Sequence, residues 1–201
     1  MSQHAMLNSH NGLVPLFKVS LLCGAILLSG CAGVKVSSPS TWFNGPLMVT
    51  NSGLGQVTSL TPMQVDTVES QLNSRYSIRT GMQMEKDEVV TVFQGLNDDE
   101  VKLEIIGPEH GYVSRIIVSD PDVVTEWGPK IGTEFSEIYQ NAFGACGLGE
   151  RVSDVATIEC KSPQSVKVVY RFTGKWQGPE GLMPSDDDLK TWQISQIIWH
   201  K

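Results

Sequence analysis

The sequence predicts a mainly β domain of the β-rich α+β class, with antiparallel sheets in a sandwich-like arrangement and two or three short helices at the edges. Three observations support this prediction. β-branched and aromatic residues alternate with polar ones over several short segments, most clearly in Glu100–Ile105. Short turn sequences such as Asn97-Asp98-Asp99 separate these segments, which favours antiparallel neighbours. Apolar residues recur at helical spacing only over short stretches.

The first predicted element is a short amphipathic helix over Pro62–Leu72. Thr61 is suited to cap it, Pro62 fits the first helical position, and Gln64 completes a capping box. Val65, Val68 and Leu72 then recur at the spacing of one helical face.

Three strands are predicted to follow this helix as an antiparallel meander. They cover Glu88–Gln94, Glu100–Ile105 and Tyr112–Ser119, and the sequence between the last two is rich in turn-forming residues. In the middle strand, Val101, Leu103 and Ile105 are expected to share one face of the sheet.

The second half of the chain predicts one more helix, a hairpin and a last strand. The helix covers Thr133–Phe143, with Thr133 as its cap. Thr157–Lys161 and Ser165–Thr173 form the hairpin. Trp192–Trp199 is apolar on both sides, so we expect this last strand to be central or covered.

The amino-terminal 30 residues have the layout of a bacterial export signal. A single basic residue, Lys18, precedes the apolar run Val19–Leu28, and residues 1–30 contain no acidic residue. A helix of ten residues covers about half of a hydrocarbon core, so a membrane-spanning helix is disfavoured. The run ends in Leu28-Ser29-Gly30-Cys31, which resembles the lipobox of bacterial lipoproteins. This resemblance implies lipidation of Cys31, which would hold the protein on a membrane as a palmitate-bearing lipoprotein.

The predicted mature protein has a tether and one domain. Residues 31–54 contain the lipidated cysteine and a segment rich in Ser, Pro and Gly, which we expect to be flexible. Residues 55–201 form a single β-rich periplasmic domain. The residue after the cysteine is Ala32, whereas many inner-membrane lipoproteins carry Asp there. The resemblance therefore implies the periplasmic face of the outer membrane.

Composition and charge restrict the class of partner. Residues 31–201 contain 14 basic and 22 acidic residues, a net charge of −8. Such a surface disfavours nucleic acid and anionic lipid as partners. An apolar content of 40 % with 18 % charged residues indicates a folded domain rather than a disordered chain.

Two cysteines remain in the predicted mature domain, Cys146 and Cys160. In an oxidising compartment, two thiols predict one intramolecular disulfide. The alternatives are a zinc site or a catalytic thiol. A zinc ion needs four ligands, and the mature chain offers only His110 and His200 beside these cysteines.

Few residues suggest catalysis. The sequence contains no nucleophile elbow, zinc-protease motif or phosphate-binding glycine loop, and we expect His110 and His200 to be surface residues. Asp186, Asp187 and Asp188 follow Ser185, which is typical of a helix start rather than of a metal site. Aromatic residues gather near the carboxyl end, where core packing is favoured over a sugar-binding platform. No cofactor or metal is therefore expected.

A distinctive stretch runs from Gly174 to Trp199, and shorter stretches include Tyr76–Met82, Lys130–Thr133 and Glu159–Lys161. Together they resemble the RpoE-regulated, YfeY-like lipoprotein family over roughly Gly53–Lys201, in addition to the lipobox. The resemblance implies a β-rich lipoprotein that is associated with the outer membrane and induced by envelope stress. It implies no established activity and supplies no catalytic residues.

These observations lead us to expect a non-enzymatic lipoprotein of the envelope stress response that binds an envelope protein or another envelope component. One alternative is a periplasmic hydrolase, which would need a deep polar pocket holding His110 beside a carboxylate and a hydroxyl. The other is a purely structural envelope lipoprotein.

The candidate contact with a partner is a loop that is rich in proline and glycine, and therefore of fixed shape. Two of its residues, Leu182 and Met183, either plug the open end of the sheet or form an exposed patch. The loop consists of Gly178, Pro179, Glu180, Gly181, Leu182, Met183, Pro184 and Ser185.

Overall fold

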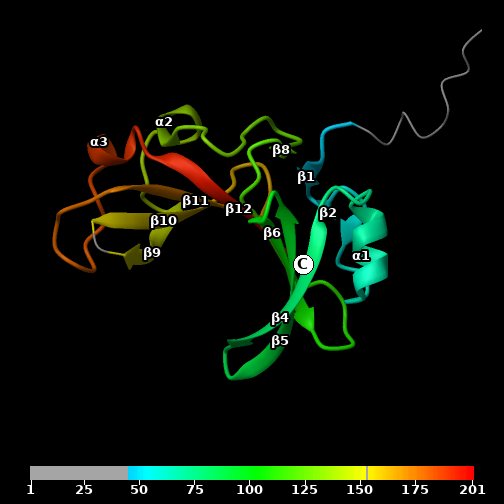
Figure 1. Cartoon of the computed structure of the whole chain (residues 1–201). Coiled ribbons are helices and arrows are strands. Elements are labelled where there is room, and N and C mark those ends of the chain that lie inside the picture. The colour runs from blue at the N-terminus through cyan, green and yellow to red at the C-terminus, as the bar shows by residue number, and fades with distance from the viewer. Residues whose placement is uncertain (1–44, 153) are drawn as a thin grey trace, which may run out of the picture. The chain divides into compact units, whose positions relative to one another are not determined.

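A computed structural model describes residues 45–152 and 154–201. These residues all belong to one compact unit of the chain. Their element order, from β1 to β12 with three short helices, is shown in Figure 1. The elements are β1 (Met48–Thr50), β2 (Gly53–Leu54), β3 (Val57–Thr58), α1 (Val65–Gln71), β4 (Ser77–Glu85), β5 (Glu88–Asn97), β6 (Glu100–Pro108), β7 (Arg115–Val118), β8 (Val124–Thr125), α2 (Phe135–Ile138), β9 (Cys146–Val152), β10 (Val155–Lys161), β11 (Val168–Lys175), α3 (Asp186–Leu189) and β12 (Gln193–His200).

Two sheets form the framework of the domain. The larger has eight antiparallel strands in the order β4-β5-β6-β7-β12-β11-β10-β9. The smaller has the order β3-β2-β1-β8, with β1 and β8 parallel. A common hydrophobic core joins them, since Val49 and Leu54 of the small sheet belong to the same buried cluster as Ile105 and Trp199 of the large one. The predicted β-rich class with antiparallel sheets and short helices is thus confirmed.

The folded region begins earlier than the sequence predicted. β1 and β2 lie within the segment 31–54 that was expected to be a flexible tether. Leu47, Val49 and Leu54 are all buried there, so residues 47–54 contribute to the core and are not a flexible tether. Cys31 and the predicted signal 1–30 lie outside the described residues.

The first two helices are shorter than predicted because tertiary hydrogen bonds replace their first or last turns. The Met63 amide donates to the Gly111 carbonyl, so the chain enters α1 only at Val65. Thr61 does not cap this helix, and its hydroxyl donates to the Gln71 side chain instead. The helix α2 is capped by Glu134, not by Thr133, and ends at Ile138.

The third helix agrees with the sequence. Ser185 caps α3 and forms a capping box with Asp188. Across residues 45–152 and 154–201, no helix is long and apolar enough to span a bilayer.

The predicted meander and hairpin are confirmed as β5-β6-β7 and β10-β11, with ends that shift by a few residues. The last strand, β12, lies between β7 and β11 and is central, as its apolar composition predicted. Leu103 and Ile105 face the core, whereas Val101 is 36 % exposed beyond a register shift between β5 and β6. The sequence did not predict β4 and β9, the two edge strands of the large sheet, or the strands of the small sheet.

Candidate functional site

The Gly178–Ser185 loop follows β11 and is held to the domain at its start. The Arg151 guanidinium donates to the carbonyls of Gly178 and Trp176, at 2.9 and 3.0 Å. The Trp176 indole packs against the main chain at Gly178, where an added Cβ would lie 2.0 Å from the ring. A glycine is therefore required at this position for the ring to occupy its place.

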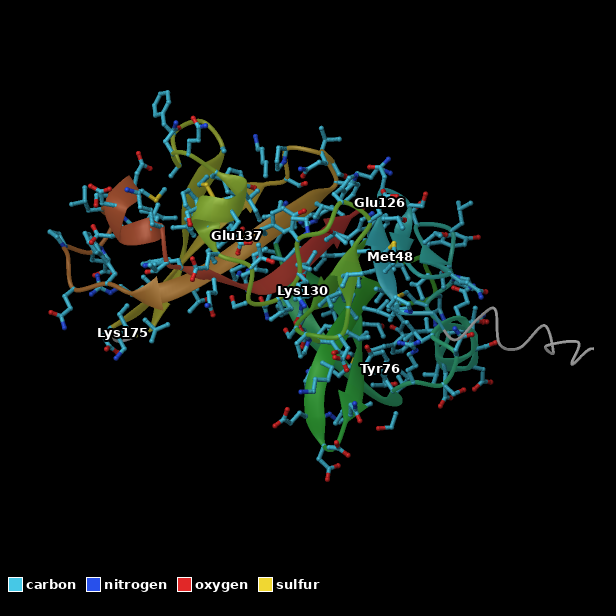
Figure 2. The ribbon with its side chains drawn as sticks, turned by 90° about the horizontal axis from the view of Figure 1, so that it is seen from above. Met48, Tyr76, Glu126, Lys130, Glu137 and Lys175 are labelled. Carbon is cyan, nitrogen blue, oxygen red and sulfur yellow. A yellow bond between two sulfur atoms is a disulfide. The ribbon has the colours of Figure 1, made fainter. Side chains whose placement is uncertain are left out.

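The other end of the loop is fixed by α3. Pro184 is buried, and the Ser185 hydroxyl accepts from the Asp188 amide at 3.2 Å. The Asp186 carboxylate accepts from the amide of Ala142 at 2.8 Å, which ties the start of α3 to the segment that follows α2. In Figure 2, Lys175, which ends β11 just before this loop, lies far from Met48 and Tyr76.

The loop's two apolar side chains have different surroundings. Leu182 is 54 % exposed. Met183 is partly buried and packs against the main core cluster. The sequence left open whether these side chains plug the sheet or are exposed. Each residue takes one of these places, since Met183 packs on the core and Leu182 faces solvent.

A cavity of about 260 Å³ lies between this loop and the β9-β10 hairpin. Apolar residues make up part of its wall, namely Leu148, Ala156, Trp176 and Leu182. Polar groups also line it, among them Arg151, Thr157 and Glu180. A hollow lined by both apolar and polar groups offers packing surface together with hydrogen-bonding groups to a ligand or partner.

A second cavity, of about 480 Å³, adjoins the first at Pro184. It is lined on one side by Met183 and on the other by Phe143, whose side chain is almost fully exposed. Phe143, Leu148 and Leu182 therefore leave apolar surface around two neighbouring hollows. Such surface is characteristic of an interaction site, because isolated domains rarely leave large apolar areas in water.

The predicted disulfide between Cys146 and Cys160 is present, with an S–S distance of 2.05 Å. It joins the start of β9 to the end of β10, and Cys146 also lines the second cavity. Closing a loop with a sequence separation of 14 stabilises the fold by roughly 3 kcal/mol in the chain-entropy treatment. The bond thus braces the edge strand that forms one wall of the site.

The two histidines lie outside this site. His110 occupies the turn between β6 and β7, and its side chain is 91 % exposed beside Glu109. His200 ends β12, where burial and the nearby Arg115 charge lower the pKa of its imidazole. No pocket lining described above includes either imidazole.

The three consecutive aspartates bind three different groups. Asp186 accepts from the Ala142 amide, Asp187 pairs with Lys190 at 2.7 Å, and Asp188 completes the cap with Ser185. The hydrogen bond from Lys190 lowers the pKa of the Asp187 carboxyl. Among the residues that the structure describes, no group of three His, Cys, Asp or Glu side chains is placed to hold a metal ion.

Sequence reasoning missed the residues that face the loop, above all Phe143, Leu148 and Arg151. The sequence predicts Phe143 at the end of a helix, whereas it lies in the segment between α2 and β9. In the sequence, the only local indication of the edge strand β9 is the pair of glycines Gly147 and Gly149. At Gly149 an added Cβ would lie 2.2 Å from the Thr157 hydroxyl oxygen, so the close approach of β9 to β10 needs glycine.

Residues 33–201 match a family model described as "Protein of unknown function (DUF1131)". The chain is 38 % identical over 187 residues to the "Uncharacterized protein YfeY" of Escherichia coli (strain K12), covering 90 % of this chain and 97 % of that protein. It is also similar to the crystal structure of the uncharacterized protein yfeY from Escherichia coli, with 41 % identity and a TM-score of 0.70. That match covers 77 % of this chain and 99 % of the solved chain.

Proposed function

This chain belongs to the DUF1131 family of proteins of unknown function, and we propose that it is a non-enzymatic envelope lipoprotein that binds a protein partner through the Gly178–Ser185 loop. Lipid on Cys31 would anchor it at the periplasmic face of the outer membrane. Its expression would rise during envelope stress, as the resemblance to RpoE-regulated lipoproteins implies.

The observation that carries the partner-binding proposal is the exposure of Leu182 on a loop held in one conformation. Arg151 and the Ser185 cap fix the two ends of the loop, so little conformational entropy would be lost when a partner binds. The neighbouring apolar side chains of Leu148 and Phe143 enlarge the surface that a partner would cover.

The anchoring proposal is supported by the position of Cys31 after a short apolar run with small residues before it. More than one acyl chain is needed for stable attachment to a bilayer, and lipoprotein processing would supply them. Replacement of Cys31 by Ala should abolish palmitate incorporation and leave the precursor uncleaved. Labelled palmitate in the Cys31→Ala protein would contradict the anchor.

The contact between the loop and a partner is tested by photo-crosslinking in living cells, with the crosslinking amino acid placed at Leu182. The matched control is Leu60, which is 80 % exposed and lies between β3 and α1. We expect a discrete crosslinked species from position 182 and none of the same size from position 60. Identical adducts from both positions, or none from position 182, would remove the loop as the contact.

A further inference from the structure

The strand β4 forms one edge of the eight-stranded sheet and, within the described part of the chain, pairs only with β5. The pairing runs without a register shift from Ser77 opposite Leu96 to Glu85 opposite Glu88. In Figure 1 the turn of the β4-β5 hairpin lies at the far end of the sheet, and β6 pairs with β5 from Val90 to Asn97. The outer edge of β4 therefore has backbone groups that no other described strand uses.

The turn of the hairpin indicates which backbone groups face outward. Lys86 and Asp87 have positive φ angles of 47° and 68°, as a two-residue type I′ turn requires. Glu85 and Glu88, which flank this turn, then form a hydrogen-bonded pair. Because the pattern alternates, the N–H and C=O groups of Thr80, Met82 and Met84 point to the free edge.

This edge lacks the features that usually prevent strand pairing. Between Arg79 and Glu85 the strand contains no proline and no charged residue. The opposite edge strand, β9, differs, since its register with β10 shifts between Ala156 and Ile158 as in a β-bulge.

The same hairpin exposes an apolar face. Met82 and Met84 are 73 % and 65 % exposed and point to one side of β4. Val89 lies opposite Met84 on β5 and is 57 % exposed. A long, regular edge that has no charge between Arg79 and Glu85 and carries exposed methionines is suited to receive another strand.

We propose that β4 pairs antiparallel with β4 of a second copy of this chain, about a two-fold axis at Met82. In this register Thr80 lies opposite the partner's Met84, and Met82 opposite the partner's Met82. The outward N–H and C=O groups of all three residues then find partners. The exposed methionines of the two copies meet on one face of the extended sheet.

Charge complementarity selects this register and favours a second copy as the occupant. It places Arg79 opposite the partner's Glu85, and by symmetry Glu85 opposite the partner's Arg79. Both side chains point to the face opposite the methionines, where Arg79 is bonded to Gln94 and Glu85 to Arg115 within one chain. A two-fold axis at Gly81 would instead place Arg79 opposite the partner's Gln83 and leave both charges without a counter-charge across the edge.

The proposal is tested by replacing Met82 with Cys in the full chain, expressed in cells. Two residues of a hydrogen-bonded antiparallel pair have Cα atoms about 5.5 Å apart, a distance that a disulfide spans. We expect a dimer on non-reducing gels that reductant removes. Met84→Cys and Gly81→Cys are the register controls, because in the proposed register neither residue faces its own copy. Leu60→Cys, at an equally exposed apolar site, controls for random collision.

A charge exchange provides an independent test of the pairing. Arg79→Glu should weaken dimer formation about tenfold, because the two-fold axis creates two like-charge pairs. Adding Glu85→Arg should restore it, with the mass measured by analytical ultracentrifugation of the full chain in detergent. A melting curve of each variant checks that the fold is intact.

Three outcomes would overturn the pairing. They are a Met82→Cys protein that stays monomeric, equal crosslinking from Leu60→Cys, and a mixed disulfide with a different protein. None of these measurements involves Leu182 or lipid labelling, so their result is independent of the proposed function.

Discussion

At the scale of single residues, two glycines determine where two indole rings lie. An added Cβ at Gly174 would lie 2.3 Å from the Trp192 ring, and at Gly178 it would lie 2.0 Å from the Trp176 ring. The stretch Gly174-Lys175-Trp176-Gln177-Gly178 therefore has a physical explanation. Each glycine makes room for a ring that packs close to the main chain.

We expect Gly174→Ala to destabilise the domain by about 1–3 kcal/mol, because Trp192 is buried and must shift to admit the methyl group. The free energy of unfolding in urea measures this. Gly147→Ala is the matched control, since an added Cβ there has open space around it. An equal loss in both variants would show that the Trp192 contact is not the cause.

Tyr76 and Asp120 form a buried polar pair in which the phenolic hydroxyl donates to the carboxylate at 2.6 Å. Tyr76→Phe removes the donor and leaves a buried carboxylate oxygen with one hydrogen bond fewer. We expect a loss of about 1–3 kcal/mol in urea-induced unfolding. Tyr112→Phe, at a side chain that is 60 % exposed, should change the stability little. A similar loss from both would contradict this role of the pair.

At the scale of elements, the Gly178–Ser185 loop combines a structural and an exposed residue in adjacent positions. Met183→Ser should remove about 1–2 kcal/mol of apolar burial and lower the melting temperature by about 2–8 °C. Leu182→Ser should leave the melting temperature nearly unchanged, because Leu182 is largely exposed. A thermal melting curve of each variant, monitored by circular dichroism, distinguishes the two effects. A large fall for Leu182→Ser would show that this side chain is part of the core.

At the scale of the whole molecule, three tyrosines couple folding to alkaline pH. Burial raises the pKa of Tyr76, Tyr139 and Tyr170, and for Tyr76 the hydrogen bond to Asp120 raises it further. Their pKa in the unfolded chain is about 10. Above that pH the unfolded state releases protons that the native state retains, so the unfolded state becomes favoured.

The contribution of these tyrosines to the free energy of unfolding should therefore be constant up to about pH 9. It should fall as the pH rises through 10 and beyond. Urea midpoints measured between pH 8 and 11 test this. The fall should be shallower in Tyr76→Phe, which lacks one of the three phenols. The same slope in both proteins would mean that Tyr76 does not contribute.

Local sequence determined the features that depend on a few neighbouring residues. The cap at Ser185 and the turn at Asn97–Asp99 were predictable because their hydrogen bonds and backbone angles involve adjacent positions. The β12 strand was predictable as central because its apolar residues occupy both faces. The disulfide between Cys146 and Cys160 was predictable because only two thiols remain in the expected mature domain and an oxidising compartment was expected.

Tertiary structure alone decided which segments join the core and which stay exposed. Leu47 and Val49 lie in a stretch with no periodic pattern, and they are buried only because the large sheet offers a partner surface. Met82 is an apolar residue in the middle of a strand, a place where such residues are often buried, yet it is 73 % exposed on the edge strand β4. Leu182 and Met183 are adjacent and chemically alike, and only tertiary packing, which places Met183 against the core cluster, separates their roles. Burial depends on contacts between distant parts of the chain, which local pattern does not encode.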